Sequence, residues 1–176
     1  MRISARADYA VRAVVELVAL GGSEPVKAER LAQGQRIPAK FLLNILVDLK
    51  RAGILRSHRG AEGGFLLGRS PEEITIADVI RAADGPLARV GHQQPEDVVY
   101  PGHAAALRDV WVAVRVSLRD VLEEVTVADV CNGQLPASVR RLLDRPDAWL
   151  TKAPARSRSV GREKSTVFVD NGGGAG

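Results

Sequence analysis

Side chains that can bind nucleic acid gather between residues 39 and 59 of the sequence. An asparagine can bond bidentately to adenine, a lysine can donate to the acceptors of guanine, and an apolar side chain can contact a thymine methyl group. Arginine and histidine can donate to phosphate oxygens. The candidate residues, with an arginine near the N-terminus, are Arg2, Ala39, Lys40, Leu43, Asn44, Arg56, His58 and Arg59. Their chemistry is that of contacts to double-stranded DNA.

The distribution of charge supports the same interpretation. Residues 27–69 carry nine Lys or Arg against three Asp or Glu, a net of +6, whereas residues 70–150 carry eight Arg against thirteen acids, a net of −5. The whole chain has a net charge of only +4, so the basic charge is localised. A localised basic segment suits a phosphate backbone. Charge alone does not separate this interpretation from a merely solvated face.

No set of residues in the sequence predicts catalysis. The three histidines, His58, His92 and His103, accompany no nucleophile elbow, metal-ligand pair or phosphate-binding glycine loop. The glycine-rich run 59–64 does not lead from a strand into a helix, as a dinucleotide site requires. We therefore expect that the protein is not an enzyme.

Composition and length indicate a cytoplasmic protein without membrane contact. The chain has 176 residues, enough for one substantial core or a small domain with an extension. No apolar run approaches the ~20 residues that cross a bilayer, and charged residues interrupt the N-terminal apolar positions, unlike in a secretory signal. The single cysteine, Cys131, excludes an internal disulfide and a thiolate metal cage.

Helical periodicity predicts the elements that would position the candidate residues. A first helix is expected over about 4–20, with Ser4 as its N-cap. A short helix over 27–33, broken by Gly34, precedes a second helix over about 38–52. Two short helices joined by a glycine-containing turn form a helix-turn-helix. The predicted inward stripe of the second helix is Phe41, Leu42, Ile45, Leu46 and Leu49.

Two short strands are predicted directly after this helix, over 54–58 and 65–67. The glycines of 59–64 between them permit the positive φ of a hairpin turn, so the hairpin would form a wing. The predicted fold class is mainly α with a small β-hairpin wing, and residues 1–86 form a winged helix-turn-helix. Read piece by piece, a generic helical domain with a surface hairpin is the alternative.

A long helix is the main prediction for the second half of the chain. A short helix over about 77–83, capped by Thr75 and Asp78, precedes a loop over 87–103. From about 104 to 125, apolar residues recur at spacings of three and four, a seam that needs a partner helix. Pairing with a second subunit is favoured over pairing with the first helix of the same chain. The predicted dimerisation residues are Leu107, Val110, Trp111, Val114, Leu118, Val121, Leu122 and Val125.

Less regular sequence follows the long helix. Peripheral helices are expected up to residue 150, so that 104–150 forms the dimerisation part of the chain. Residues 151–176 have the composition of a disordered tail.

Four motifs in one order carry a family resemblance. They are MRISARADYAVRAVVELV, RIPAKFLLNILVDLKRAGIL, RSHRGAEGGFLL and EEITIADVIRAADGPLA. Over residues 1–130 the chain resembles the Rrf2 family of bacterial regulators. The resemblance implies a winged helix-turn-helix with a long dimerisation helix, acting as a homodimer on pseudo-palindromic DNA, most often as a repressor. The family more often has an acidic residue where this chain has Leu43, so its operator would differ; core packing is the alternative role for Leu43.

Many members of that family sense through an iron-sulfur cluster held by three cysteines in the loop before the long helix. The corresponding loop here, 89–103, has no cysteine, although it contains His92 and His103. Such clusters are normally bound by thiolates, so we expect no cluster and no metal. Control by a protein or small-molecule co-regulator is left open, as is a pocket between the winged domain and the long helix. The rival function is a protein-interaction adaptor controlled by a metabolic-enzyme partner.

Overall fold

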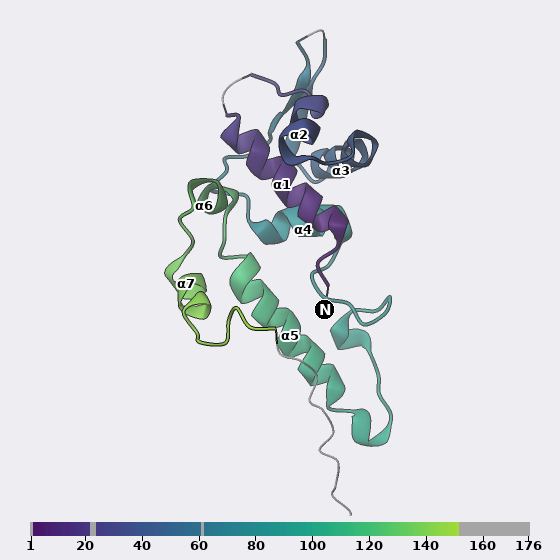
Figure 1. Ribbon diagram of the computed structural model, residues 1–176. Helices are drawn as coiled ribbons and strands as arrows, with labels where there is room; N and C mark the ends of the chain where they lie inside the picture. The colour runs from purple at the N-terminus through teal and green to yellow at the C-terminus, as the bar shows by residue number, and fades with distance from the viewer. Residues whose placement is uncertain (1, 22–23, 61, 152–176) are drawn as a thin grey trace, which may run out of the picture.

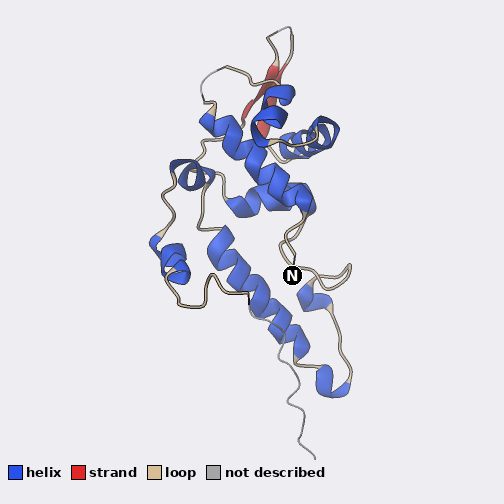
Figure 2. Ribbon diagram, viewed as in Figure 1, coloured by secondary structure: helices blue, strands red, loops and turns tan. Residues whose placement is uncertain are grey.

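The computed structural model describes residues 2–21, 24–60 and 62–151 (Figure 1). Apart from Thr151, the predicted tail 151–176 lies outside the described residues. The fold is mainly helical with one two-stranded hairpin, as predicted (Figure 2). Within the described part of the chain, no helix combines the length and apolar character needed to cross a membrane.

Helix α1 (Ala5–Ala19) is the central element and contacts α2, α3, α4 and α6 (Figure 1). Its N-cap is Ser4, as predicted, and the Ser4 hydroxyl accepts from the Ala7 N–H at 2.9 Å. This bond satisfies one of the free N–H groups of the first turn. The buried residues Ala7, Ala10, Ala13, Val14 and Leu17 form a stripe at helical spacing. Most are alanines, so neighbouring helices can approach α1 closely.

Helices α2 (Ala28–Gln35) and α3 (Ala39–Arg51) form the predicted helix-turn-helix. The prediction that Gly34 breaks the first of them is wrong, because α2 continues through Gly34 and the chain turns at Arg36, with a φ of 54°. A Cβ atom on Gly34 would lie 2.3 Å from Glu16 Oε1. The glycine therefore serves the close approach of α2 to α1 and does not end the helix.

The inward stripe of α3 is one residue narrower than predicted. Leu42, Ile45, Leu46 and Leu49 are fully buried, as expected. Phe41 is instead 39% exposed, and its ring meets the edge of the Tyr9 ring at a centroid distance of 5.7 Å. One residue along a helix is a rotation of about 100°, so Phe41 lies at the border of the stripe and covers the side of α1.

The wing consists of β1 (Leu55–His58) and β2 (Gly64–Leu67), antiparallel, within one residue of the predicted strands. Val26 pairs with Phe65 on the outer side of β2, through N–H to O distances of 2.9 and 2.8 Å. A Cβ atom on Gly64 would lie 2.5 Å from the Val26 carbonyl oxygen, so only glycine permits this pairing. The segment before α2 thus anchors the base of the wing.

Backbone hydrogen bonds between the starts of two capped helices join the segment after the long helix to the winged domain. Helix α4 (Ile76–Asp84) has the predicted Thr75–Asp78 box, and α6 (Val127–Asn132) begins with an equivalent box. The two N-termini pair through backbone bonds: Ile76 N–H to Val125 O and Val127 N–H to Ile74 O, each 2.9 Å. Val125 consequently enters the core, at 6% exposure.

Helix α5 (Leu107–Leu122) extends away from the winged domain (Figure 1), and α7 (Ala137–Leu143) follows α6 along the chain. It is shorter at both ends than the predicted 104–125. At its start the chain forms a 3-10 turn, η2 (Gly102–Ala104), and at its end the capping box of α6 redirects the backbone. No residue of α5 is buried.

The predicted loop 87–103 lies along α5 and contains a second 3-10 turn, η1 (Pro95–Asp97). Two contacts hold it there: Arg115 is ion-paired to Glu96 at 2.5 Å, and Trp111 Nε1 donates to the Tyr100 hydroxyl at 3.0 Å. The loop is therefore fixed to the first half of α5 by side chains.

Candidate nucleic-acid interface

One face of α3 is exposed and carries the residues predicted to contact bases. Lys40, Leu43, Asn44 and Val47 repeat at spacings of three and four, so they lie on one side of the helix. Leu43 is 46% exposed, which excludes core packing as its role. Val47, at 44% exposure, is not among the residues predicted from the sequence. The same helical spacing could have identified it.

The N-terminus of α3 is open and electropositive. Its N-cap, Pro38, supplies no side-chain acceptor. The N–H groups of Phe41 and Leu42 donate to Pro38 O, but those of Ala39 and Lys40 have no acceptor among the described residues. Free N–H groups and the helix dipole attract anions at this end of a helix. Exposed Ala39 leaves room for a close approach, and the Lys40 ammonium adds to the positive potential.

The wing lies directly beside α3. Gly53, with a φ of 72°, reverses the chain, and Ile54 N–H donates to Leu49 O at 3.0 Å. Arg56, His58 and Arg59 are all exposed, as their predicted role requires. Because side chains alternate along a strand, Arg56 and His58 project from the same face of β1. The hairpin projects beyond α2 and away from α5 (Figure 1).

Most of the basic residues between 27 and 69 are free to bind an external anion. Two of the nine are ion-paired, Arg51 with Asp48 at 3.2 Å and Arg69 with Asp78 at 3.5 Å. The other seven have no ion pair with any residue that the structure describes: Lys27, Arg30, Arg36, Lys40, Lys50, Arg56 and Arg59. The net positive charge of this segment is thus not neutralised by the part of the chain that the structure describes.

Two arginines of α1 hold the helix-turn-helix in place. Arg6 is ion-paired to Asp48 of α3, and its Nε donates to Ala83 O of α4 at 2.8 Å. Arg12 donates to the side chain and the backbone carbonyl of Gln35, at the end of α2. These residues fix the orientation of α3 from behind its exposed face. Nothing in their sequence spacing indicated this positioning role.

The remaining predicted DNA contact, Arg2, is exposed but lies in a different setting. It lines two cavities between the start of α1 and α5, one shared with Leu87 and Trp111 and the other with Asp84 and Leu118. The structure therefore does not bring Arg2 together with the wing. Its contact with DNA stays a prediction.

The predicted dimerisation residues fall into three groups along α5. Leu107, Val110 and Trp111 are exposed at 40%, 49% and 37%. Val114, Leu118, Val121 and Leu122 are half-buried, and the last two pack against the core of the chain. Val125 lies beyond the helix in that core, so it is not on an exposed seam. An exposed apolar surface thus remains over the N-terminal half of α5, whereas exposed Val116 lies nine residues after Leu107 and so on the opposite side of the helix.

The sequence has too few cysteines for a three-cysteine iron-sulfur site. The only cysteine of the sequence, Cys131, is half-buried in α6, beyond the long helix. No three His, Cys, Asp or Glu residues within the described ranges lie close enough together to hold a metal ion. Since clusters are bound by several thiolates, the residues of this chain do not fit a three-cysteine site.

The sequence is similar to known bacterial regulators. Residues 3–133 match the model of the Rrf2 family, described as an iron-dependent transcriptional regulator. A Mycobacterium tuberculosis protein, Rv1287, named as an HTH-type transcriptional regulator, is 51% identical over 144 residues, or 82% of this chain and 89% of the relative. The HTH-type regulator CymR of Bacillus subtilis is 30% identical, over 75% of this chain and 91% of CymR.

Solved structures show the same fold. The structure of CymR, the global cysteine regulator of B. subtilis, aligns with a TM-score of 0.64 and 29% identity, covering 76% of this chain and 98% of CymR. IscR of T. potens aligns with a TM-score of 0.61 and 28% identity, covering 76% and 88%. From the family match, the close relatives and the shared winged-helix fold, the chain belongs to the Rrf2 family of transcriptional regulators and is not an enzyme.

Proposed function

We propose that this protein is a repressor that binds a pseudo-palindromic operator as a homodimer in the bacterial cytoplasm. The observation that carries the proposal is the exposed face of α3, within a segment of the chain (residues 27–59) that holds seven basic residues without an ion pair among the described residues. In a helix-turn-helix the second helix enters the major groove, and its N-terminal residues contact base edges.

Sequence would be read by the four-residue face of α3. Lys40 donates to guanine acceptors, and Asn44 bonds bidentately to adenine. Leu43 and Val47 are apolar and exposed, so they suit thymine methyl groups. The open N-terminus at Ala39 receives a phosphate. An α3 face that is half apolar and half polar favours an operator with thymines next to the bases that Lys40 and Asn44 read.

The wing would bind the DNA backbone. Arg59 follows β1 at the start of the hairpin turn, where it can reach a phosphate or the adjacent minor groove. Arg56 and His58 share one face of the strand and donate to phosphates. None of these contacts reads a base in the major groove, so the wing contributes affinity and salt dependence.

The dimer would form through α5. The exposed apolar residues on one side of this helix, Leu107, Val110 and Trp111, would be covered by the same helix of a second subunit. The hydrophobic effect favours such burial by about 25 cal/mol per Å² of apolar surface. Two recognition helices related by a two-fold axis would then meet half-sites about 34–36 Å apart.

DNA selection with the purified full-length protein, followed by anisotropy titrations, tests the proposal. We expect enrichment of a two-fold symmetric site and a loss of about 1–3 kcal/mol at one base position for Asn44→Ala. Arg140→Ala on α7, an exposed residue with no ion pair to the described part of the chain, is the matched control. Failure to bind any DNA at low salt would refute a repressor and favour the protein-interaction adaptor.

The same sample tests how the regulator is controlled. We propose control without an iron-sulfur cluster, since the chain has one cysteine. Protein purified without oxygen should be colourless between about 300 and 500 nm, where thiolate-bound clusters absorb. A brown protein would refute cluster-free control and leave the DNA-binding proposal standing.

A further inference from the structure

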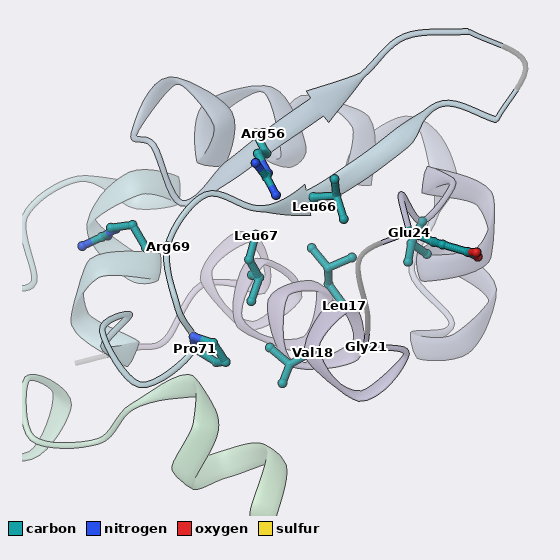
Figure 3. Close-up of a pocket in the computed structure, with 10 residues that line it drawn as sticks. Leu17, Val18, Gly21, Glu24, Arg56, Leu66, Leu67, Arg69 and Pro71 are labelled. Atoms are coloured by element: carbon teal, nitrogen blue, oxygen red, sulfur yellow. The ribbon is translucent and has the colours of Figure 1, made fainter.

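A cavity of about 280 Å³ lies between the C-terminal end of α1, residues 24–26 and the base of the wing (Figure 3). Its walls are mostly aliphatic: Leu17 and Val18 come from α1, and Leu66 and Leu67 come from β2. Ligand sites are typically concave and apolar with a few polar groups that fix orientation, and they begin at about 300 Å³. The size and walls of this cavity suit a small ligand with an aliphatic body.

One cation faces the cavity. The guanidinium of Arg56 points toward Leu66 and Leu67 (Figure 3), and Arg56 has no ion pair with any described residue. The other two charged residues at the rim point elsewhere. The Arg69 guanidinium is directed outward and is paired with Asp78 at 3.5 Å, and the Glu24 carboxylate lies at the opposite end, directed away from Arg56 (Figure 3).

A planar guanidinium binds a carboxylate through two parallel hydrogen bonds, and the pair is stronger beside apolar surface than in water. We propose that this cavity binds a small aliphatic monocarboxylate, whose carboxylate is held by Arg56 and whose body lies against Leu17, Val18 and Leu67. A single inward-facing cation selects one negative charge, because a second carboxylate would lie among the leucines and lose its hydration without compensation.

Binding there would regulate the DNA contact of the wing, an extension that rests on the proposed function. Arg56 is one of the residues proposed to donate to phosphate, and a ligand that holds its guanidinium in the cavity keeps that group directed away from a phosphate outside. The carboxylate would therefore lower the affinity for DNA. By linkage, DNA must lower the affinity for the carboxylate by the same factor.

Calorimetric titration of the DNA-free, full-length protein with 4-methylpentanoate tests the site itself. The neutral isostere 4-methylpentanamide should bind about tenfold to a hundredfold more weakly, because hydrogen bonds to a charged group are lost. Arg56→Gln should cause a loss of similar size. Arg30→Gln is the matched control: it removes an exposed arginine of α2 that does not line the cavity and has no ion pair with a described residue, and it should leave the dissociation constant unchanged.

Variants that fill the cavity test whether the carboxylate binds there or elsewhere on the protein. Val18→Phe should fill the cavity and abolish carboxylate binding. Leu66→Phe, which fills the cavity from β2, is the second variant in case the first one unfolds. Circular dichroism verifies that each variant is folded. No binding at about 10 mM, where a dissociation constant of 1 mM would give near saturation, overturns the proposal. Equal binding of the amide, or binding that survives in both folded variants, also overturns it. DNA binding is measured separately, in the absence of ligand. A protein that binds no DNA would refute the repressor and leave the proposal of a carboxylate site unaffected.

Discussion

Arg59→Ala should change the salt dependence of DNA binding by an amount that the structure predicts. Arg59 is exposed at the end of β1 and has no ion pair with a described residue, so alanine removes a cation without leaving an acidic group unpaired. Each phosphate contact contributes about 0.9 to the slope of log affinity against log salt. A homodimer presents two copies, so the slope should become shallower by about 1.8.

This slope converts into a ratio that anisotropy titrations can measure. Between about 50 and 200 mM salt, a fourfold change, a difference of 1.8 corresponds to about 12-fold in affinity. Arg59→Ala should thus weaken binding about 12-fold more at the lower salt concentration than at the higher one. A monomer on a single half-site would show only about 3.5-fold, since one contact is lost.

The refuting result is a loss of affinity that is the same at both salt concentrations. Such a loss would mean that Arg59 supports the wing's conformation and binds no phosphate. Arg140→Ala on α7 is the control for net charge, and its slope should match that of the wild type.

Three further predictions concern the core, the dimer and the loop. Leu46→Ala, at a fully buried position of α3, should lower the free energy of unfolding by about 2–5 kcal/mol in a urea titration; a loss below 1 kcal/mol would contradict the packing described. Val110→Glu should convert the dimer to a monomer in analytical ultracentrifugation, because a carboxylate would be buried in an apolar interface, and an unchanged mass would refute an α5 dimer. A backbone hydrogen bond and then Arg115 hold the pKa of Glu96 below its ordinary value of 4.5, so this contact stabilises the loop above about pH 4.5 and is lost as the pH falls through the lowered pKa. Trp111 fluorescence should follow that loss, and Glu96→Gln should abolish the dependence; the same acid transition in the variant would exclude Glu96 as its cause.

Local patterns account for what could be predicted from the sequence about the fold. Ser4 caps α1, Thr75 and Asp78 form a capping box, and the four leucine and isoleucine residues of α3 face inward, because each feature depends on neighbours within one or two helical turns. The candidate DNA-binding surface was predictable for the same reason. Val47 shares the spacing of Lys40 and Asn44 and lies one turn beyond the predicted face, so the same pattern extends to it.

Contacts between distant segments account for the differences. Glycine is a residue type that often ends helices, yet Gly34 lies within α2. It is required there because Glu16, on another helix, packs against it. Val125 continues the apolar spacing of α5, yet backbone pairing with the start of α4 draws it into the core. The positioning role of Arg6 depends on Asp48 of α3 and Ala83 of α4, which are distant from it in the sequence.

The sequence by itself determined the type and order of the elements and the family, because periodicity and turn chemistry are local. It also predicted the candidate DNA contacts on α3 and the wing. The tertiary structure alone decided which arginines form ion pairs among the described residues and which do not. It also decided that Arg56 faces a cavity and that only three of the eight predicted seam residues, Leu107, Val110 and Trp111, stay exposed. These properties depend on which side chains from separate segments come within a few ångströms of each other. The spacing of residues along the sequence does not specify such contacts.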